Sequence, residues 1–195
     1  MKETIIIIRG ANYLSSNIKF FRSLILLFYK TFNVIPYYGW KREEWIKFLN
    51  KNNRRLIYFN WSGNFWKFAV SRASSDLLEL IKNKKCVKII ACSLGAQIAI
   101  NVARKADNVV KIVSIGGVYK PHNLKIPSID IRSKTDYFCN FFNNLFLFFS
   151  ITKKTKKKEI WLNNISHNDF HNNITIKTGK FKGKSLSELL NFCLR

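Results

Sequence analysis

The stretch VKIIACSLGAQIAI, residues 87–100, decides the fold that we expect for this chain. Its first six residues are apolar apart from one lysine, which predicts a buried strand, and the part after the turn is a helix rich in Ala and Ile. Ser93 lies at the turn, with Ala91 two residues before it and Gly95 two residues after it. This is the arrangement of a nucleophile elbow, whose usual pattern is G-x-S-x-G, because bulky flanking groups would separate the strand from the helix.

The surroundings of an elbow serine can activate its hydroxyl as a nucleophile. The helix that begins after Ser93 presents N–H groups without intrahelical acceptors, together with the positive end of the helix dipole. The N–H of Leu94 is therefore the expected first donor of an oxyanion hole. A serine that only caps a helix would give a similar local sequence, because serine is common at N-caps.

Short β-branched runs alternate with longer helical patterns along the chain. We expect strands at residues 5–9, 34–38, 56–61, 87–92, 111–115, 129–132 and 159–164. We expect helices at residues 18–32, 42–51, 71–83, 94–105, 137–149 and 185–194. Strands separated by such helices form βαβ units, which build a parallel sheet flanked by helices. Ligands of such sheets bind at the carboxyl ends of the strands, where the candidate residues fall.

A nucleophilic serine needs a base and an acid that orients the base, and after an elbow they follow in the order acid, histidine. The chain has three histidines, His122, His167 and His171. His122 lies in a loop after the strand at 111–115, whereas the other two follow the last expected strand. We choose His167, which is nearer to that strand end, with His171 second. A surface histidine without a catalytic role is the alternative interpretation.

The segment IPSIDIRSKTDYF offers two candidates for the acid, Asp130 and Asp136. Asp130 lies within the strand pattern, where its side chain would be buried or on a face of the sheet. Asp136 lies just beyond the strand end, at the same edge as the elbow and the histidine loop, so we choose Asp136. It also precedes a helical run, so a role as a helix N-cap is the alternative for this residue.

The second oxyanion donor is expected from the loop after the first strand, Arg9-Gly10-Ala11-Asn12. Gly10 allows the backbone to turn close to a ligand, and the N–H of Ala11 would then face the site. A first-strand turn without any catalytic role would have a similar sequence.

These residues together resemble the small lipase-like serine hydrolases of the α/β-hydrolase superfamily. The matching segments are residues 87–117, 133–136, 165–167, 9–10 and 61–63. Arg9 stands where that family has a histidine, and Ala91 stands where it has a glycine. The resemblance implies an α/β-hydrolase fold over residues 1–195 as a single domain, with a mainly parallel sheet and flanking helices in three layers. No large cap is expected, because residues 117–129 are too few to hold one.

The charge of the chain is strongly positive, with 34 Lys and Arg against 11 Asp and Glu and a formal net charge of +23. Such a surface attracts anionic partners. The basic residues are nevertheless spread along the chain, with one dense run at residues 153–158, and the accompanying abundance of Asn, Ile and Phe indicates compositional drift. We therefore expect peripheral contact with anionic membrane as an open role for that run, no nucleic acid and no specific protein partner.

Cofactors and metals are not expected, because the sequence shows neither a phosphate-binding glycine loop nor His, Cys and Asp at metal-ligand spacing. The four cysteines lack C-x-x-C spacing and are expected as buried, reduced thiols. The N-terminus has no cleavage site, and no apolar stretch is long enough to span a membrane, so we expect a cytoplasmic protein.

Three functions are compatible with these features. The first is a carboxylic-ester hydrolase, with a lipid ester as one candidate substrate, in which Ser93 attacks, His167 transfers the proton and Asp136 orients the imidazole. The second is a thioesterase with the same three residues. The third is a hydrolase-fold protein with little catalytic power whose basic surface binds anionic membrane or nucleic acid.

Overall fold

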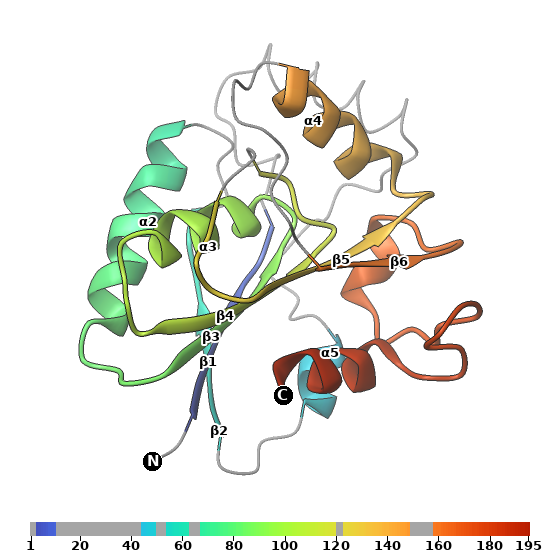
Figure 1. Ribbon diagram of the computed structural model, residues 1–195, viewed down its shortest axis with the longest axis horizontal. Helices are drawn as coiled ribbons and strands as arrows, with labels where there is room; N and C mark the ends of the chain where they lie inside the picture. Colours follow the sequence, from blue (N-terminus) through green and yellow to red (C-terminus); the bar gives the residue numbers. More distant parts are fainter. Residues whose placement is uncertain (1–2, 11–43, 50–53, 63–66, 120–122, 149–157) are drawn as a thin grey trace.

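The computed structural model of the protein describes residues 3–10, 44–49, 54–62, 67–119, 123–148 and 158–195 (Figure 1). The helix expected at 18–32 and the strand expected at 34–38 lie outside these residues, as do Ala11, His122 and most of the basic run at 153–158.

The described strands form one six-stranded sheet in which every neighbouring pair is parallel, in the order β2-β1-β3-β4-β5-β6. The strands are β1 (Glu3–Ile8), β2 (Arg54–Phe59), β3 (Val87–Cys92), β4 (Val109–Ile115), β5 (Ser128–Ser133) and β6 (Lys158–Leu162). The strand β1 lies between β2 and β3 and is buried on both faces, which explains its run of four isoleucines. The parallel sheet predicted from the alternating pattern is therefore confirmed.

Helices cover both faces of the sheet. The helices are α2 (Lys67–Ile81), α3 (Gly95–Ala103), α4 (Tyr137–Phe148) and α5 (Leu186–Leu194), with 3-10 turns η2 (Glu44–Phe48) and η3 (Asn168–His171). In Figure 1, α2 and α3 lie on one side of the sheet, and α5 and η2 lie on the other. The molecule thus has the three layers that the resemblance implied.

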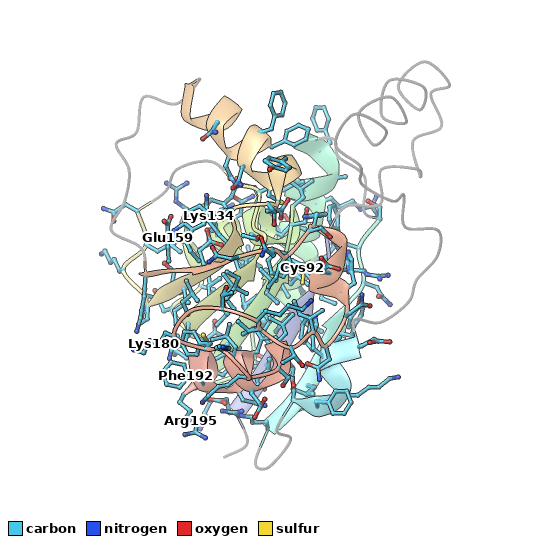
Figure 2. All side chains as sticks on the ribbon, turned by 90° about the vertical axis from the view of Figure 1, so that its right-hand side faces the viewer. Cys92, Lys134, Glu159, Lys180, Phe192 and Arg195 are labelled. Atoms are coloured by element: carbon cyan, nitrogen blue, oxygen red, sulfur yellow. The ribbon has the colours of Figure 1, made fainter. Side chains whose placement is uncertain are left out.

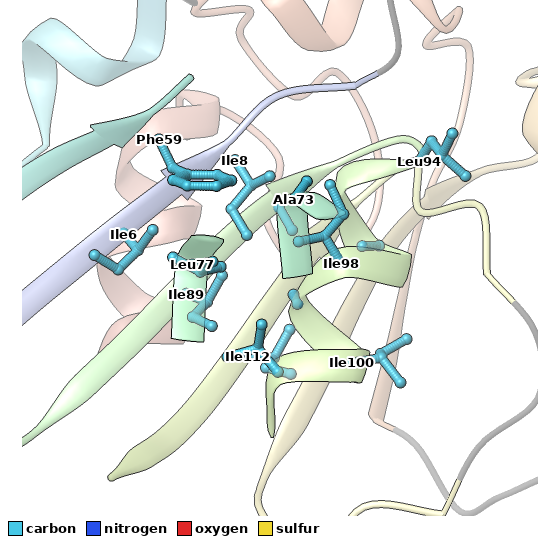
Figure 3. Close-up of a cluster of buried hydrophobic side chains, with 14 of the residues drawn as sticks. Ile6, Ile8, Phe59, Ala73, Leu77, Ile89, Leu94, Ile98, Ile100 and Ile112 are labelled. Atoms are coloured by element: carbon cyan, nitrogen blue, oxygen red, sulfur yellow. The ribbon is translucent and has the colours of Figure 1, made fainter. Parts of the chain in front are cut away.

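Each face of the sheet has its own apolar core. On β1, Ile6 and Ile8 point toward α2 and α3, whereas Ile5 and Ile7 point toward α5, as the two-residue period of a strand requires. Figure 3 shows the first core, where Leu77 of α2 lies against the strands. Figure 2 shows how side chains fill the space between the layers, with Cys92 in the interior.

The element bounds differ from the sequence-based expectations by at most four residues at either end. The strand β3 has the expected bounds, whereas β4 begins at Val109, two residues earlier than expected. The helix α2 begins at Lys67 instead of residue 71. Its first four residues were not predicted, because the residues before Ser71 lack a helical pattern in the sequence. Within the described residues, no helix has the length and apolarity needed to cross a membrane.

Because all described strands are parallel, their carboxyl ends lie at one edge of the sheet. Gly10 follows β1 by two residues, Ser93 follows β3 directly, and Gly116 follows β4 directly. Asp136 and His167 lie three and five residues beyond the ends of β5 and β6 (Ser133 to Asp136, Leu162 to His167). The topology therefore gathers residues far apart in the sequence at this edge.

Candidate active site

Ser93 occupies a strained turn between β3 and α3. Its φ angle is +48°, in the left-handed region that non-glycine residues rarely adopt. The turn is held by its own backbone: the Ser93 N–H donates to the Ile115 carbonyl at 3.0 Å, and the Ser93 carbonyl accepts from the N–H groups of Val118 and Ala96, each at 3.0 Å. The side chain is buried, and its Oγ makes no hydrogen bond with any described residue.

Two glycines allow the backbone to pack tightly around this turn. A Cβ atom on Gly10 would lie 2.8 Å from the Ser93 Cβ, so the loop after β1 can approach the serine only without a side chain there. A Cβ atom on Gly95 would lie 2.6 Å from the Arg9 carbonyl oxygen and 2.9 Å from that of Ile8. Gly95 therefore lets the N-terminus of α3 rest on the end of β1.

Ala91 and Leu94 complete the elbow. Ala91 is fully buried and pairs with Ile8 of β1. Leu94 is the N-cap residue of α3, so its N–H belongs to the first turn, where N–H groups lack intrahelical acceptors. This N–H belongs to the residue that directly follows Ser93.

Asp136 joins two elements through its two carboxylate oxygens. Its Oδ1 accepts from the backbone N–H of Cys139 at 3.0 Å and so caps α4, as the helix-cap interpretation expected. Its Oδ2 lies 3.0 Å from His167 Nδ1. Burial alone would raise the pKa of this carboxyl, but the charge and hydrogen bond of His167, together with Cys139, hold it below its ordinary value. The N-cap interaction and the histidine contact therefore occur together.

The loop that carries His167 is fixed on both sides of the imidazole. The Thr135 hydroxyl donates to the Ile165 carbonyl at 3.0 Å, and the Asp169 carboxylate accepts from the N–H and the hydroxyl of Ser166, both at 2.7 Å. The His171 ring packs edge-on against the His167 ring, with 6.4 Å between centroids. Burial, followed by the charges of His167 and Arg9, lowers the pKa of His171 to about 4.

Cys139 lies against the Asp136–His167 pair. Its Sγ is 3.3 Å from His167 Nδ1, and its thiol donates to the Gly116 carbonyl at 2.8 Å. Burial, followed by the Asp136 charge, raises the pKa of this thiol well above its ordinary value. Gly116 has a φ angle of +51°, and a Cβ atom there would lie 3.0 Å from Asp136 Oδ2.

Gly116 connects the pair to the elbow. It follows Ile115, whose carbonyl accepts from the Ser93 N–H, and its own carbonyl accepts from the Cys139 thiol. The Ser93 backbone therefore contacts the residue before Gly116, and the Asp136 carboxylate lies against Gly116 itself. The structure brings Asp136 and His167 into hydrogen-bond contact, and it shows no hydrogen bond between His167 and Ser93 Oγ.

The alternative acid, Asp130, is engaged elsewhere. It is almost fully buried in β5, and its carboxylate accepts from the Ser114 hydroxyl, the Tyr119 hydroxyl and the Arg132 guanidinium. Burial, followed by the charge of Asp130, raises the pKa of Tyr119 well above its ordinary value. This network contributes to the interior of the fold and leaves Asp136 as the carboxylate at the histidine.

Two residues near the site were not singled out from the sequence. Asn143 of α4 donates through Nδ2 to the Gly117 carbonyl at 2.7 Å and accepts through Oδ1 from the Tyr119 N–H at 3.2 Å, and so ties α4 to the loop after β4. Cys139 was considered only as one of four cysteines. Its position three residues after Asp136 in a predicted helix was the available signal.

Three described side chains have the atom types of a metal site. Asp136, Cys139 and His167 each offer one ligand atom, and these atoms lie within 4.8 Å of one another. The sequence spacing gave no indication of this set, because the chain brings the three together only through the ends of β5 and β6.

No protein-family model matches the chain, and no curated protein matches it. Several solved structures are nevertheless similar in fold. Naproxen esterase (carboxylesterase NP) from Bacillus subtilis is similar over 99% of this chain and 82% of that chain, with a TM-score of 0.51 and 8% identity. An acylaminoacyl peptidase from Pyrococcus horikoshii is similar over 85% of this chain and 33% of that chain, with a TM-score of 0.50 and 13% identity.

A third structure, an uncharacterized protein from Bacillus cereus ATCC 10987, is similar over 87% of this chain and 56% of that chain, with a TM-score of 0.50 and 14% identity. At such identities the likeness concerns the fold alone. The parallel sheet with helices on both faces agrees with this likeness, and the chain has a fold of the α/β-hydrolase type.

Proposed function

We propose that this protein is a serine hydrolase that cleaves a carboxylic ester through an acyl-enzyme. Ser93 is the nucleophile, His167 is the general base and Asp136 orients the imidazole. The observation that carries the proposal is the 3.0 Å contact between Asp136 Oδ2 and His167 Nδ1 at the sheet edge where Ser93 stands in its strained turn. The fold likeness to a carboxylesterase and to a peptidase supports acyl transfer as the reaction class.

The contacts of the pair define the protonation states that the reaction needs. Asp136 is a carboxylate, so it accepts the Nδ1 proton of a neutral His167 and leaves Nε2 as the basic nitrogen. As Ser93 Oγ attacks the carbonyl carbon, its proton passes to Nε2, and the imidazolium is stabilised by Asp136. The same proton then passes to the leaving alkoxide, and the acyl group stays on Ser93 until water removes it by the reverse proton transfers.

The developing oxyanion needs donors next to the hydroxyl. The Leu94 N–H, at the N-terminus of α3, is the first donor. We assign the second to the N–H of Ala11, which follows Gly10, the residue that packs against Ser93 without a side chain. Two such donors contribute to the rate to the extent that they bind the tetrahedral intermediate more strongly than the planar ester.

The test is a set of p-nitrophenyl esters of increasing acyl length, with acyl-thioesters in parallel. We expect ester turnover in the wild type, its loss in Ser93→Ala, and a decrease of about 10⁴-fold in kcat for Asp136→Asn, because the amide favours the wrong imidazole tautomer. Ser75→Ala, an exposed serine of α2, is the matched control and should retain turnover. Turnover of thioesters alone would redirect the proposal to a thioesterase, and equal turnover in Ser93→Ala would refute it.

A further inference from the structure

We propose that Asp136, Cys139 and His167 form a binding site for a thiophilic divalent cation, Zn²⁺ being the best fit, and that its binding inhibits the hydrolase. The inhibitory part rests on the proposed function, whereas the binding part does not. The three ligand atoms come from the residue before α4, the first turn of α4 and the loop after β6, and they lie within 4.8 Å of one another.

The ligand set has the chemistry and spacing of a zinc site. Zinc takes thiolate sulfur at about 2.3 Å and imidazole nitrogen or carboxylate oxygen at about 2.0–2.2 Å, in tetrahedral geometry. Such bonds place neighbouring sulfur and nitrogen ligands about 3.5 Å apart, and nitrogen and oxygen ligands about 3.3 Å apart. The observed separations are 3.3 Å from Cys139 Sγ to His167 Nδ1 and 3.0 Å from that nitrogen to Asp136 Oδ2. Along these two contacts an ion therefore needs the groups to separate by only a few tenths of an ångström, and the third pair, Cys139 Sγ and the Asp136 carboxylate, lies within 4.8 Å.

The surrounding contacts preorganise these ligands. The Cys139 backbone N–H holds Asp136 Oδ1, which leaves Oδ2 as the coordinating oxygen. In the metal-free protein the Gly116 carbonyl accepts from the Cys139 thiol and so keeps the sulfur next to the imidazole; this bond is lost when the thiol deprotonates. The His167 side chain is 14% exposed, against 1% for the Asp136 side chain, so the imidazole is the side from which an ion can enter.

Charge and proton balance favour a divalent ion. Zn²⁺ takes the Nδ1 lone pair, so the proton of the neutral imidazole moves to Nε2, and the thiol proton leaves to solvent. One proton is thus released for each ion bound, and the thiolate and carboxylate together neutralise the two positive charges. Burial next to Asp136 disfavours the thiolate in the free protein, but a bound dication reverses that preference, as coordinating metals deprotonate thiols outright.

The bound ion and the proposed reaction exclude each other. With Zn²⁺ on Nδ1, the proton sits on Nε2, so the imidazole has no lone pair with which to accept the Ser93 proton. Asp136 is at the same time bound to the metal instead of orienting the ring. Inhibition should therefore lower kcat in proportion to the fraction of metal-bound protein, and a chelator should reverse it.

The binding part is tested with Co²⁺, which reports a thiolate ligand through a charge-transfer absorption band, followed by displacement with Zn²⁺. We expect one Co²⁺ per chain with this band in the wild type, in Ser93→Ala and in Cys86→Ala. Cys86 is the matched control: among the cysteines of the described residues it is the one that is only half-buried, so its replacement by alanine disturbs the core least. Cys139→Ala and Cys139→Ser should lose the band and weaken Zn²⁺ binding by about 100-fold or more, since even removing a residue that only supports a ligand costs 10- to 100-fold.

The outcomes separate the two parts of the inference. Absence of the band in the wild type, or its persistence in a folded Cys139→Ser protein, would refute the site. Binding in Ser93→Ala stands whether or not the protein hydrolyses esters. The inhibitory part predicts that Zn²⁺ inhibits ester hydrolysis by the wild type and by Cys86→Ala equally, and inhibits Cys139→Ser much less. If Zn²⁺ inhibits Cys139→Ser as strongly as the other two proteins, the ion acts at another site and the inhibitory part is wrong.

Discussion

Gly95→Ala tests whether the elbow depends on the close approach of α3 to β1. In an ordinary helix this change stabilises by up to about 1 kcal/mol, because alanine is the better helix former. Here the new Cβ would lie 2.6 Å and 2.9 Å from two backbone oxygens, those of Arg9 and Ile8. The Ile8 oxygen belongs to the last residue of β1 and the Arg9 oxygen to the buried residue that follows it, so neither can move without displacing this backbone, and overpacking of about 1–3 kcal/mol outweighs the helix preference.

We therefore expect Gly95→Ala to lower the free energy of unfolding by about 1–2 kcal/mol, which for a urea slope of about 2 kcal/mol/M moves the midpoint by about 0.5–1 M. Urea unfolding followed by tryptophan fluorescence measures this shift, with Ser75→Ala as the control for a helix substitution in open space. Leu94 is the N-cap residue of α3, so a shift of the helix also moves the Leu94 N–H. For a displacement of this donor near 1 Å, kcat for ester hydrolysis should fall by about 10²-fold. A Gly95→Ala protein as stable as the wild type would refute this reasoning.

Three further substitutions test other parts of the account. Ser93→Gly should be more stable to urea than Ser93→Ala by about 0.5–1 kcal/mol, because glycine adopts the φ angle of +48° without a Cβ penalty; equal midpoints would argue against strain at the turn. Asn143→Leu should lower the free energy of unfolding by about 1–3 kcal/mol, since it removes the hydrogen bonds that the Asn143 side chain makes to the Gly117 carbonyl and to the Tyr119 N–H, and an unchanged urea midpoint would contradict this. Burial raises the pKa of the Cys193 thiol from 9.0 to about 11, so the folded state favours the protonated thiol. The free energy of unfolding should therefore fall by about 2–3 kcal/mol as the pH rises from about 9 to about 11, where only the unfolded chain readily loses this proton. Cys193→Ala should reduce this alkaline loss in urea unfolding, and an identical pH dependence in the variant would contradict the assignment.

The sequence was most informative where a local pattern has one structural solution. The run at residues 87–92 is too apolar for a surface strand and is followed at once by Ser93 and Gly95, so the bounds of β3 could be predicted residue for residue. Asp136 could be preferred over Asp130 because it lies beyond the strand end, and the structure indeed places it against His167. Arg132, Ser114 and Tyr119 explain why Asp130 points into the fold, but nothing in their spacing reveals that network.

The arrangement around the imidazole could not be read from the sequence. Cys139 contacts His167 because α4 begins at Tyr137, directly after Asp136, and because Gly116 leaves room for the Asp136 carboxylate, which a Cβ atom there would approach to 3.0 Å. Both conditions depend on how α4 sits over the end of β4, which no local pattern determines. For the same reason the sequence indicated no metal-ligand set, whereas the folded chain places three ligand atoms together.

The most direct test of the central claim is covalent labelling with a fluorophosphonate, which reacts with a serine hydroxyl only where a base and an oxyanion hole activate it. We predict a single adduct on Ser93 by intact mass and peptide mapping, no adduct in Ser93→Ala, and much slower labelling in His167→Gln than in His171→Gln. An adduct on another residue, or unchanged labelling of Ser93→Ala, would contradict the assignment of Ser93 as the nucleophile.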